Sequence, residues 1–144
     1  MDLTTSYPRS PRQELGGFAH LARMIDKAKA SRAGKLGEYI YPCPLDRRLL
    51  DFLEITPERF SEAIDKKKDE EIVEWVRKEM RPRSKEEIAA WNKSFLSQSP
   101  DNDEKWAYFK KLRDSIDPSR TDITTWPDLL DLDEKRSVPL RKAG

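Results

Sequence analysis

The sequence lacks several features on which whole classes of protein depend. It has one cysteine and one histidine among 144 residues, and its formal net charge at pH 7 is only +1. A single thiol cannot close an internal disulfide, so we expect a reducing, cytoplasmic setting. The near-zero charge excludes a globally basic nucleic-acid-binding protein and an acidic solvating tail. One histidine and one cysteine also supply too few ligands for the usual tetrahedral zinc site, and we expect no metal and no cofactor.

Long apolar segments are missing as well. The longest uninterrupted runs, residues 88–91 and 106–109, are four residues long, whereas a membrane-spanning helix needs about 20 apolar residues. The N-terminal residues lack the basic patch and the apolar stretch of a secretory signal. We therefore expect a cytoplasmic protein that does not associate with membranes.

The sequence is rich in charged and aromatic residues instead. Charged residues make up 38% of the chain and hydrophobic residues only 36%, a composition close to that of disordered proteins. The four Trp, four Tyr and five Phe residues can each bury on the order of 150 to 250 Å². This aromatic content favours a small folded domain with a charged surface.

Helical periodicity and capping signals recur along the chain. Apolar residues at helical spacing predict a first helix from about residue 15 to residue 33, with Gly34 after its end. Residues 56–58 (Thr-Pro-Glu) and residues 124–128 (Thr-Thr-Trp-Pro-Asp) have the pattern of a capped helix start. Ser84 with Glu87 is typical of a capping box, and Asp101 or Ser99 is expected to cap the helix that follows.

These elements together predict an all-α fold. We expect a compact bundle of six or seven short helices, with one structured loop, rich in Gly, Tyr and Pro, after the first helix. Residues 1–14 are expected to form an extended arm, residues 15–135 a single domain and residues 136–144 a flexible tail.

Several short motifs carry a resemblance to a known family. They are Pro-Arg-Ser-Pro-Arg at 8–12, Leu-Gly-Gly at 15–17, Leu-Ala-Arg-Met-Ile-Asp-Lys-Ala at 21–28, Gly34 to Gly37-Glu38-Tyr39, Cys43-Pro44-Leu45-Asp46, Phe60, Trp91-Asn92, Trp126 and Asp128-Leu129-Leu130. On these residues the chain resembles a bacterial family known only as domain of unknown function 5069. The resemblance implies a small, stand-alone bacterial protein and implies no activity.

Ionisable and phenolic side chains gather in the first predicted helix and in the loop after it. The candidate ligand-binding residues are Arg23, Asp26, Lys27, Glu38, Tyr39, Tyr41, Cys43 and Asp46. Glycines and prolines can hold such a loop in one shape over the helix. An alternative is that Asp26 and Glu38 form ion pairs with Arg23, Arg47 or Arg48 and only tie the loop down.

Cys43 and His20 are the residue types of a nucleophilic pair, but nothing in the sequence brings them together. His20 falls on the helix side of Arg23 and Lys27, where an exposed histidine is the ordinary expectation. A cysteine between two prolines is equally consistent with a buried, inert side chain. We therefore assign no catalytic residue.

Two further surfaces are weaker candidates. Arg12, Gly16 and Gly17 precede the first predicted helix, and amides at a helix start can hold an anion. A basic corner around Pro82 could contact phosphates of a nucleic acid; it consists of Arg77, Lys78, Arg81, Arg83 and Lys85. Nucleic acid is not the partner we expect, because no aromatic residue lies within this corner and the total charge is small.

The leading functional hypothesis is a non-catalytic binding or protein-interaction module whose contact face is built from the first helix and residues 37–46. The alternative is an enzyme or ligand-sensing domain that acts on a small anionic metabolite at the same face. A shallow groove would favour the module, whereas a concave pocket ringed by Arg23, Lys27 and Tyr39 would favour the alternative. Weak nucleic-acid binding is a third hypothesis. The identity of the partner, an unknown protein or a small anionic ligand, stays open.

Overall fold

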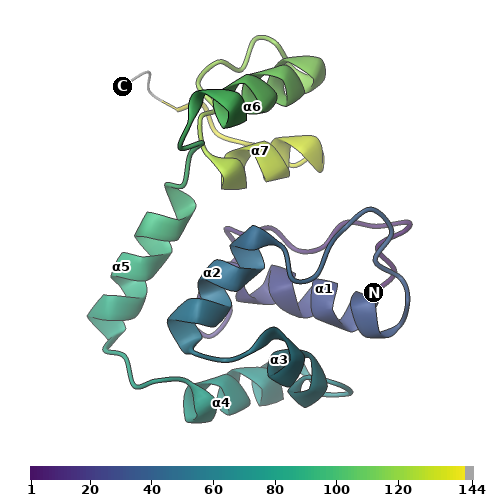
Figure 1. Cartoon of the computed structure of the whole chain (residues 1–144), viewed down its shortest axis with the longest axis vertical. Coiled ribbons are helices and arrows are strands. Elements are labelled where there is room, and N and C mark those ends of the chain that lie inside the picture. The colour runs from purple at the N-terminus through teal and green to yellow at the C-terminus, as the bar shows by residue number, and fades with distance from the viewer. Residues whose placement is uncertain (142–144) are drawn as a thin grey trace. The chain divides into compact units, whose positions relative to one another are not determined.

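The computed structural model describes residues 1–141 of the chain. These residues hold seven helices (Figure 1): α1 Leu21–Arg32, α2 Pro44–Leu53, α3 Pro57–Ala63, α4 Asp69–Glu79, α5 Lys85–Leu96, α6 Asp103–Ile116 and α7 Trp126–Asp133. The predicted all-α class is confirmed. None of the helices in residues 1–141 combines the length and the apolar character needed to cross a lipid bilayer.

Most helix starts lie where their capping residues predict them. The Thr56 hydroxyl accepts a hydrogen bond from the Arg59 amide at 3.2 Å. Ser84 and Glu87 form a reciprocal capping box with bonds of 3.1 and 3.0 Å. The cap of α6 was predicted wrongly: Asn102 takes this place, because its extended backbone lets its side chain accept from the Lys105 amide at 2.7 Å.

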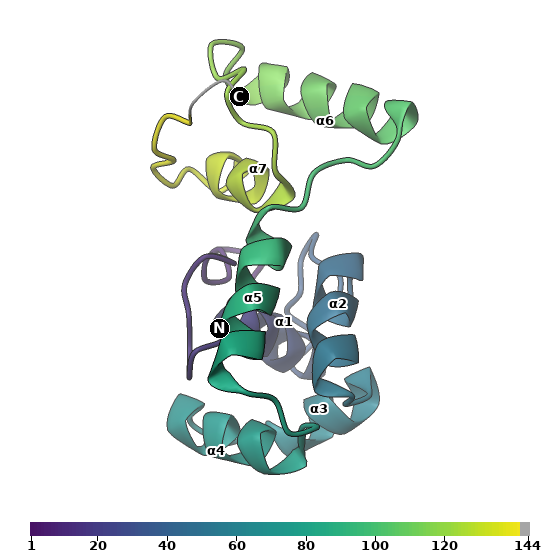
Figure 2. The same ribbon diagram turned by 90° about the vertical axis from the view of Figure 1, so that its left-hand side faces the viewer.

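The chain folds as two units, and the first runs from Met1 to Trp91. Its core is lined by apolar side chains from α1 to α4, among them Leu21, Met24, Leu49, Leu53, Phe60, Ile64, Ile72 and Val76. Within this unit α3 and α4 lie at one end of α1 and α2 (Figure 1, Figure 2). The predicted extent of one domain, residues 15–135, stays a prediction.

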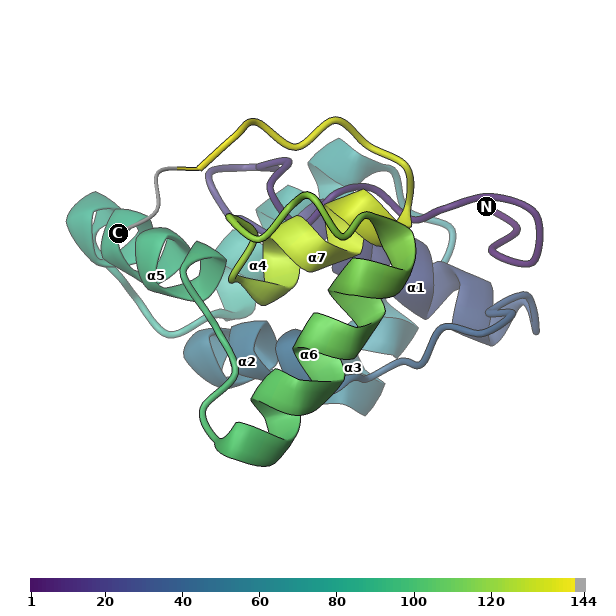
Figure 3. The same cartoon turned by 90° about the horizontal axis from the view of Figure 1, so that it is seen from above.

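The second unit begins at Asn92 and has a smaller core. Phe109, Ile123, Leu129 and Val138 form this core, with Trp106 and Trp126 packed against it. Here α7 lies beside α6 (Figure 2, Figure 3), and the segment after α7 turns back toward the loop that follows α6. The guanidinium of Arg120 in that loop donates to the Pro139 carbonyl at 3.2 Å.

The first helix begins later than its periodicity predicts. α1 starts at Leu21 rather than at Leu15, because residues 15–18 form a tight turn in which Leu15 and Phe18 exchange two backbone hydrogen bonds of 3.0 Å. Gly16 and Gly17 have φ angles of +60° and +88°, which favour glycine. A Cβ on Gly16 would lie 2.5 Å from a methyl carbon of Val73 in α4, so this turn tolerates no side chain there.

Both ends of the chain make specific contacts. In the predicted N-terminal arm, residues 1–14, Leu3 is buried and its amide donates to the Lys35 carbonyl at 2.9 Å. In the predicted flexible tail, residues 136–144, Val138 is buried and Arg141 bonds to two aspartates. Residues 142–144 lie outside the described residues.

Candidate functional site

Residues 21–28 of α1 are buried on all sides, although three of them are charged. Every residue from Leu21 to Ala28 is buried, including Arg23, Asp26 and Lys27 at 2%, 7% and 3% exposure. The expectation that the helix side of Arg23 and Lys27 is exposed is therefore wrong. The N-terminal segment and residues 37–46 cover the polar side of α1, and they bring partners for each charge.

The carboxylate of Asp46 in α2 is surrounded by three residues: His20, the N-cap of α1; Lys27 of α1; and Cys43, the N-cap of α2. The Lys27 ammonium donates to Asp46 Oδ2 at 2.8 Å, and His20 Nε2 lies 2.7 Å from Asp46 Oδ1. The Lys27 ammonium also lies 3.0 Å from the Cys43 sulfur. The Cys43 amide donates to Asp46 Oδ2 at 3.0 Å, which caps α2. We call His20, Lys27, Cys43 and Asp46 the Asp46 cluster.

The electrostatics of the Asp46 cluster keep one full negative charge on the carboxylate. Burial by itself would raise the pKa of Asp46, but the hydrogen bond from His20 and the charge of Lys27 outweigh it and hold the pKa well below its usual range. Burial lowers the pKa of His20, and Lys27 and Arg23 lower it further against the pull of Asp46. His20 is thus neutral near pH 7 and donates its Nε2 hydrogen to the carboxylate.

Sequence reasoning missed His20 as a member of this cluster. It is 0% exposed, whereas an exposed surface histidine was expected. The error follows from the helix boundary, since His20 is the N-cap of α1 and not a residue on its face. Its φ of 70° lies in the left-handed region, a strained conformation for a residue with a side chain.

Arg9 is a second residue that the site analysis missed. Its backbone amide, Nε and Nη2 all donate to the carboxylate of Asp26, at 2.9, 3.1 and 3.1 Å. The same guanidinium donates to Asp69, the first residue of α4, at 2.7 and 3.2 Å. This bond lowers the pKa of Asp69 and raises that of Arg9. In the sequence, the feature that could have pointed to Arg9 is its place in the Pro-Arg-Ser-Pro-Arg motif, one of the motifs that carry the family resemblance.

The other predicted site residues lie around the loop. The Arg23 guanidinium lies 5.6 Å from the ring centre of Tyr39 and donates to the Arg9 carbonyl at 3.3 Å. The Tyr41 hydroxyl donates to the Pro57 carbonyl at 2.8 Å, and burial raises the pKa of that phenol. Glu38 is exposed and forms no ion pair within residues 1–141. Asp26 pairs with Arg9 and not with the arginines that were expected.

The outer side of the loop forms one wall of a shallow groove, which we call the loop groove. It has a volume of about 310 Å³ and is lined by Ser31, Arg32, Tyr41, Pro42, Pro57, Glu58, Ser61 and Glu62. Ile40, which precedes the lining residue Tyr41 in the chain, is 67% exposed. The charged side chains of Lys27 and Asp46 are thus buried, whereas the lining of the loop groove contains two acids, Glu58 and Glu62, and one cation, Arg32.

The two weaker candidate surfaces are largely occupied by contacts within the chain. Gly16 and Gly17 do not open α1, which removes the premise of an anion site at a helix start. In the basic corner, Arg77 donates to the Gly16 carbonyl and Arg83 lies 4.6 Å from the Phe52 ring centre. Arg81 pairs with Glu54 at 3.4 Å. Lys78 and Lys85 remain exposed.

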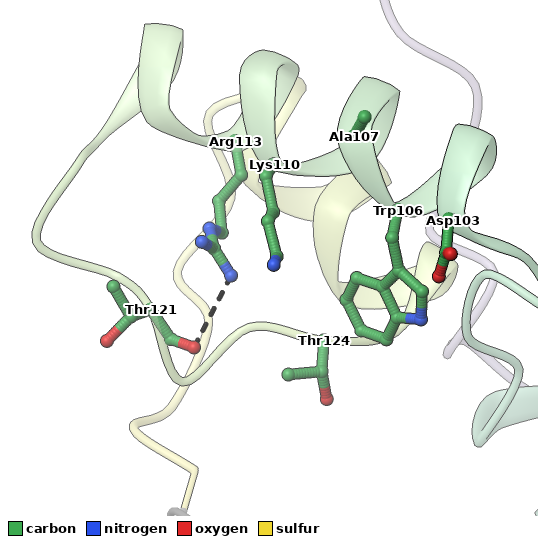
Figure 4. A pocket seen from close by; sticks show the side chains of 7 residues that line it. All are labelled: Asp103, Trp106, Ala107, Lys110, Arg113, Thr121 and Thr124. Carbon is green, nitrogen blue, oxygen red and sulfur yellow. Dashed lines mark hydrogen bonds between the residues drawn. The ribbon is translucent and has the colours of Figure 1, made fainter.

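A larger cleft lies in the second unit. Its volume is about 740 Å³, and it is bounded by α6 and the loop before α7 (Figure 4). The lining residues are Asp103, Trp106, Ala107, Lys110, Arg113, Thr121 and Thr124. None of them was a candidate from the sequence. Within residues 1–141, no group of three His, Cys, Asp or Glu side chains could hold a metal ion.

Comparison with known families decides where the chain belongs. Residues 5–136 match a family described as Domain of unknown function (DUF5069). The chain belongs to this family. The match confirms the resemblance carried by the short motifs, and it spans Arg9, the Asp46 cluster, the loop groove and the cleft of the second unit. No curated protein matches the chain.

Proposed function

We propose that the protein is a non-catalytic interaction module that binds a protein segment in the loop groove. The observation that carries this proposal is the Asp46 cluster, which ties residues 43–46 to α1. These residues directly follow Tyr41 and Pro42, which line the groove. A loop that is already fixed in its binding shape loses little conformational entropy when a partner docks. The buried charges thus serve the groove by holding its wall in place.

The chemistry of the loop groove favours a basic partner. Tyr41, Pro42 and Pro57 offer an apolar wall, and Glu58 and Glu62 add two carboxylates. The one cation of the groove, Arg32, already lies 3.7 Å from Asp65. A segment with a lysine or arginine next to an apolar residue complements this combination, and the exposed Ile40 extends the apolar contact.

The alternative hypothesis, an enzyme or sensor for a small anionic metabolite, has less support. Such a site needs accessible cations, but Arg23 and Lys27 are only 2% and 3% exposed. The Lys27 ammonium is already bound to Asp46. The nucleic-acid hypothesis is weaker still, because Arg77, Arg81 and Arg83 serve contacts within the chain. A bacterial, cytoplasmic setting remains part of the proposal.

Selection from a random peptide display library on the immobilised full chain tests the proposal. We expect the enriched peptides to contain Lys or Arg next to an apolar residue. In fluorescence polarisation, Glu62→Gln and Ile40→Ser should each weaken binding by about threefold to fivefold, the size of an exposed ionic or apolar contact.

The matched control is Glu86→Gln, which removes an exposed acid of α5 outside the groove. It should leave the affinity unchanged. Enriched peptides without basic residues, or peptides that bind both groove variants as tightly as the wild type, would contradict the proposal.

A further inference from the structure

The cleft of the second unit, here the α6 cleft, has a fixed wall. Arg113 is 6% exposed, and its Nη1 donates to the carbonyls of Thr121 and Ile123 at 3.4 and 3.0 Å. These bonds fasten the loop before α7 to α6, as the dashed line to Thr121 shows in Figure 4. The side of the cleft opposite α6 is therefore held in one position, which is the condition for a preformed binding site.

The other end of the α6 cleft is an aromatic face. The indole of Trp106 packs edge-to-face on Phe109 with ring centres 5.5 Å apart, and Phe109 packs in the same way on Trp126. Phe109 is 0% exposed, so this stack anchors Trp106 to the core. A ligand ring would thus meet a rigid indole.

Lys110 lies between the aromatic end and the arginine. Its ammonium is 5.9 Å from the Trp106 ring centre, and it pairs with no carboxylate among residues 1–141. Figure 4 shows the side chain extending into the space between Arg113 and Trp106, toward Thr121 and Thr124. An ammonium without a carboxylate partner is suited to bind an anionic group.

The charges of the α6 cleft are arranged along its length. Asp103 lies at the Trp106 end, whereas Lys110 and Arg113 lie toward the other end (Figure 4). A ligand with negative charge at both ends would therefore be repelled by Asp103. A ligand with one anionic group next to a flat apolar ring matches this arrangement of charges in the cleft. The volume of about 740 Å³ is within the usual range for small-molecule sites.

We infer that the α6 cleft binds a small aromatic acid that carries a single negative charge, with its ring on Trp106 and its carboxylate on Lys110. This site is independent of the loop groove, and its test uses different residues. A result at one site leaves the other hypothesis untouched.

The test is an NMR titration of the ¹⁵N-labelled full chain with 2-naphthoate, followed through the indole N–H signal of Trp106. We expect saturable shifts of this signal. 2-Naphthamide, which has the same ring and no charge, should bind about fivefold more weakly, and so should 2-naphthoate to Lys110→Gln. Lys110 is exposed, so its replacement leaves the fold intact.

Lys111→Gln is the matched control, because Lys111 is the next exposed lysine of α6 and does not line the cleft. Its affinity for 2-naphthoate should stay within about twofold of that of the wild type. The inference is overturned if the Trp106 signal does not shift, if the amide binds as well as the acid, or if Lys111→Gln weakens binding as much as Lys110→Gln.

Discussion

The two units of the chain bury charge in opposite ways. In the first unit, Lys27 and Asp46 are both sealed from water, with side-chain exposures of 4% and 0%. In the second unit, Asp128 is sealed at 2%, but its partner Arg141 is 36% exposed. Asp131 and Glu134 are likewise buried and bind Arg136, whose side chain is 29% exposed. Of these pairs among the described residues, only Lys27–Asp46 in the first unit has both side chains sealed from water.

This difference predicts unequal sensitivity to mutation. When both partners of a pair are buried, removal of one leaves a charge that water cannot reach. When one partner lies at the surface, water can enter and replace part of the lost interaction. The buried pair Lys27–Asp46 holds the wall of the loop groove in place. The partly exposed pairs of Arg136 and Arg141 lie in the second unit, which contains the α6 cleft.

The largest effect is expected for Lys27→Met, which leaves the Asp46 carboxylate buried without its ammonium. The free energy of unfolding should fall by about 3 to 5 kcal/mol, as for other broken buried pairs. Urea denaturation measures this change, and Lys78→Met, at an exposed position of α4, is the control with little effect. A loss below about 1 kcal/mol would show that the pair is not sealed.

A smaller effect is expected for Arg141→Ala in the second unit. The change removes two side-chain hydrogen bonds to Asp128, of 3.0 and 3.1 Å. The backbone amide of residue 141 still donates to Asp122, at 2.8 Å. We expect a loss of about 1 to 2 kcal/mol, with faster amide hydrogen exchange in α7. A loss as large as that of Lys27→Met would remove the contrast between the two units.

The smallest effect is a pH dependence that only the first unit can supply, because His20 is the single histidine of the chain. Its pKa is lowered in the folded state from the ordinary 6.5, so below pH 6.5 the unfolded chain takes up a proton that the folded chain does not. The contribution of neutral His20 to the free energy of unfolding is therefore fully present above pH 6.5. Below pH 6.5 the free energy of unfolding falls by up to about 1 kcal/mol per pH unit.

Urea denaturation between pH 7 and pH 5.5 measures this slope. His20→Asn should remove it, since asparagine tolerates the left-handed backbone and does not titrate. A wild-type stability that rises as the pH falls through this range would mean that His20 is charged in the folded state, and the assigned arrangement of protons would be wrong.

Local signals in the sequence predicted the helices well. The caps at Thr56, Ser84 and Thr125 depend on side chains within three residues of one another, so the sequence around them contains the whole interaction. The start of α1 was missed because the apolar residues of the turn at 15–18 continue the helical spacing of the helix itself.

The site was only partly predictable. The structure brings Lys27, Cys43 and Asp46 of the predicted ligand-binding set into contact, because the loop 37–46 follows α1 directly in the chain. Ligand binding by this set stays a prediction. Their burial was not predicted, since periodicity assigns charged residues to the solvent side of a helix. The partners that make burial tolerable come from farther away: Arg9 lies 17 residues from Asp26 and 60 from Asp69. Contacts between residues so far apart in the chain leave no periodic pattern in the sequence from which they could be predicted.

The titration of the Asp46 carboxyl group tests the central claim most directly, because a sealed and paired carboxylate is what holds the loop to α1. Its carboxyl ¹³C chemical shift can be followed by NMR from pH 7 downward. The account predicts that Asp46 stays ionised through pH 3.8, the ordinary value for aspartate, until the chain unfolds. A folded protein in which Asp46 takes up its proton at or above pH 3.8 would contradict it.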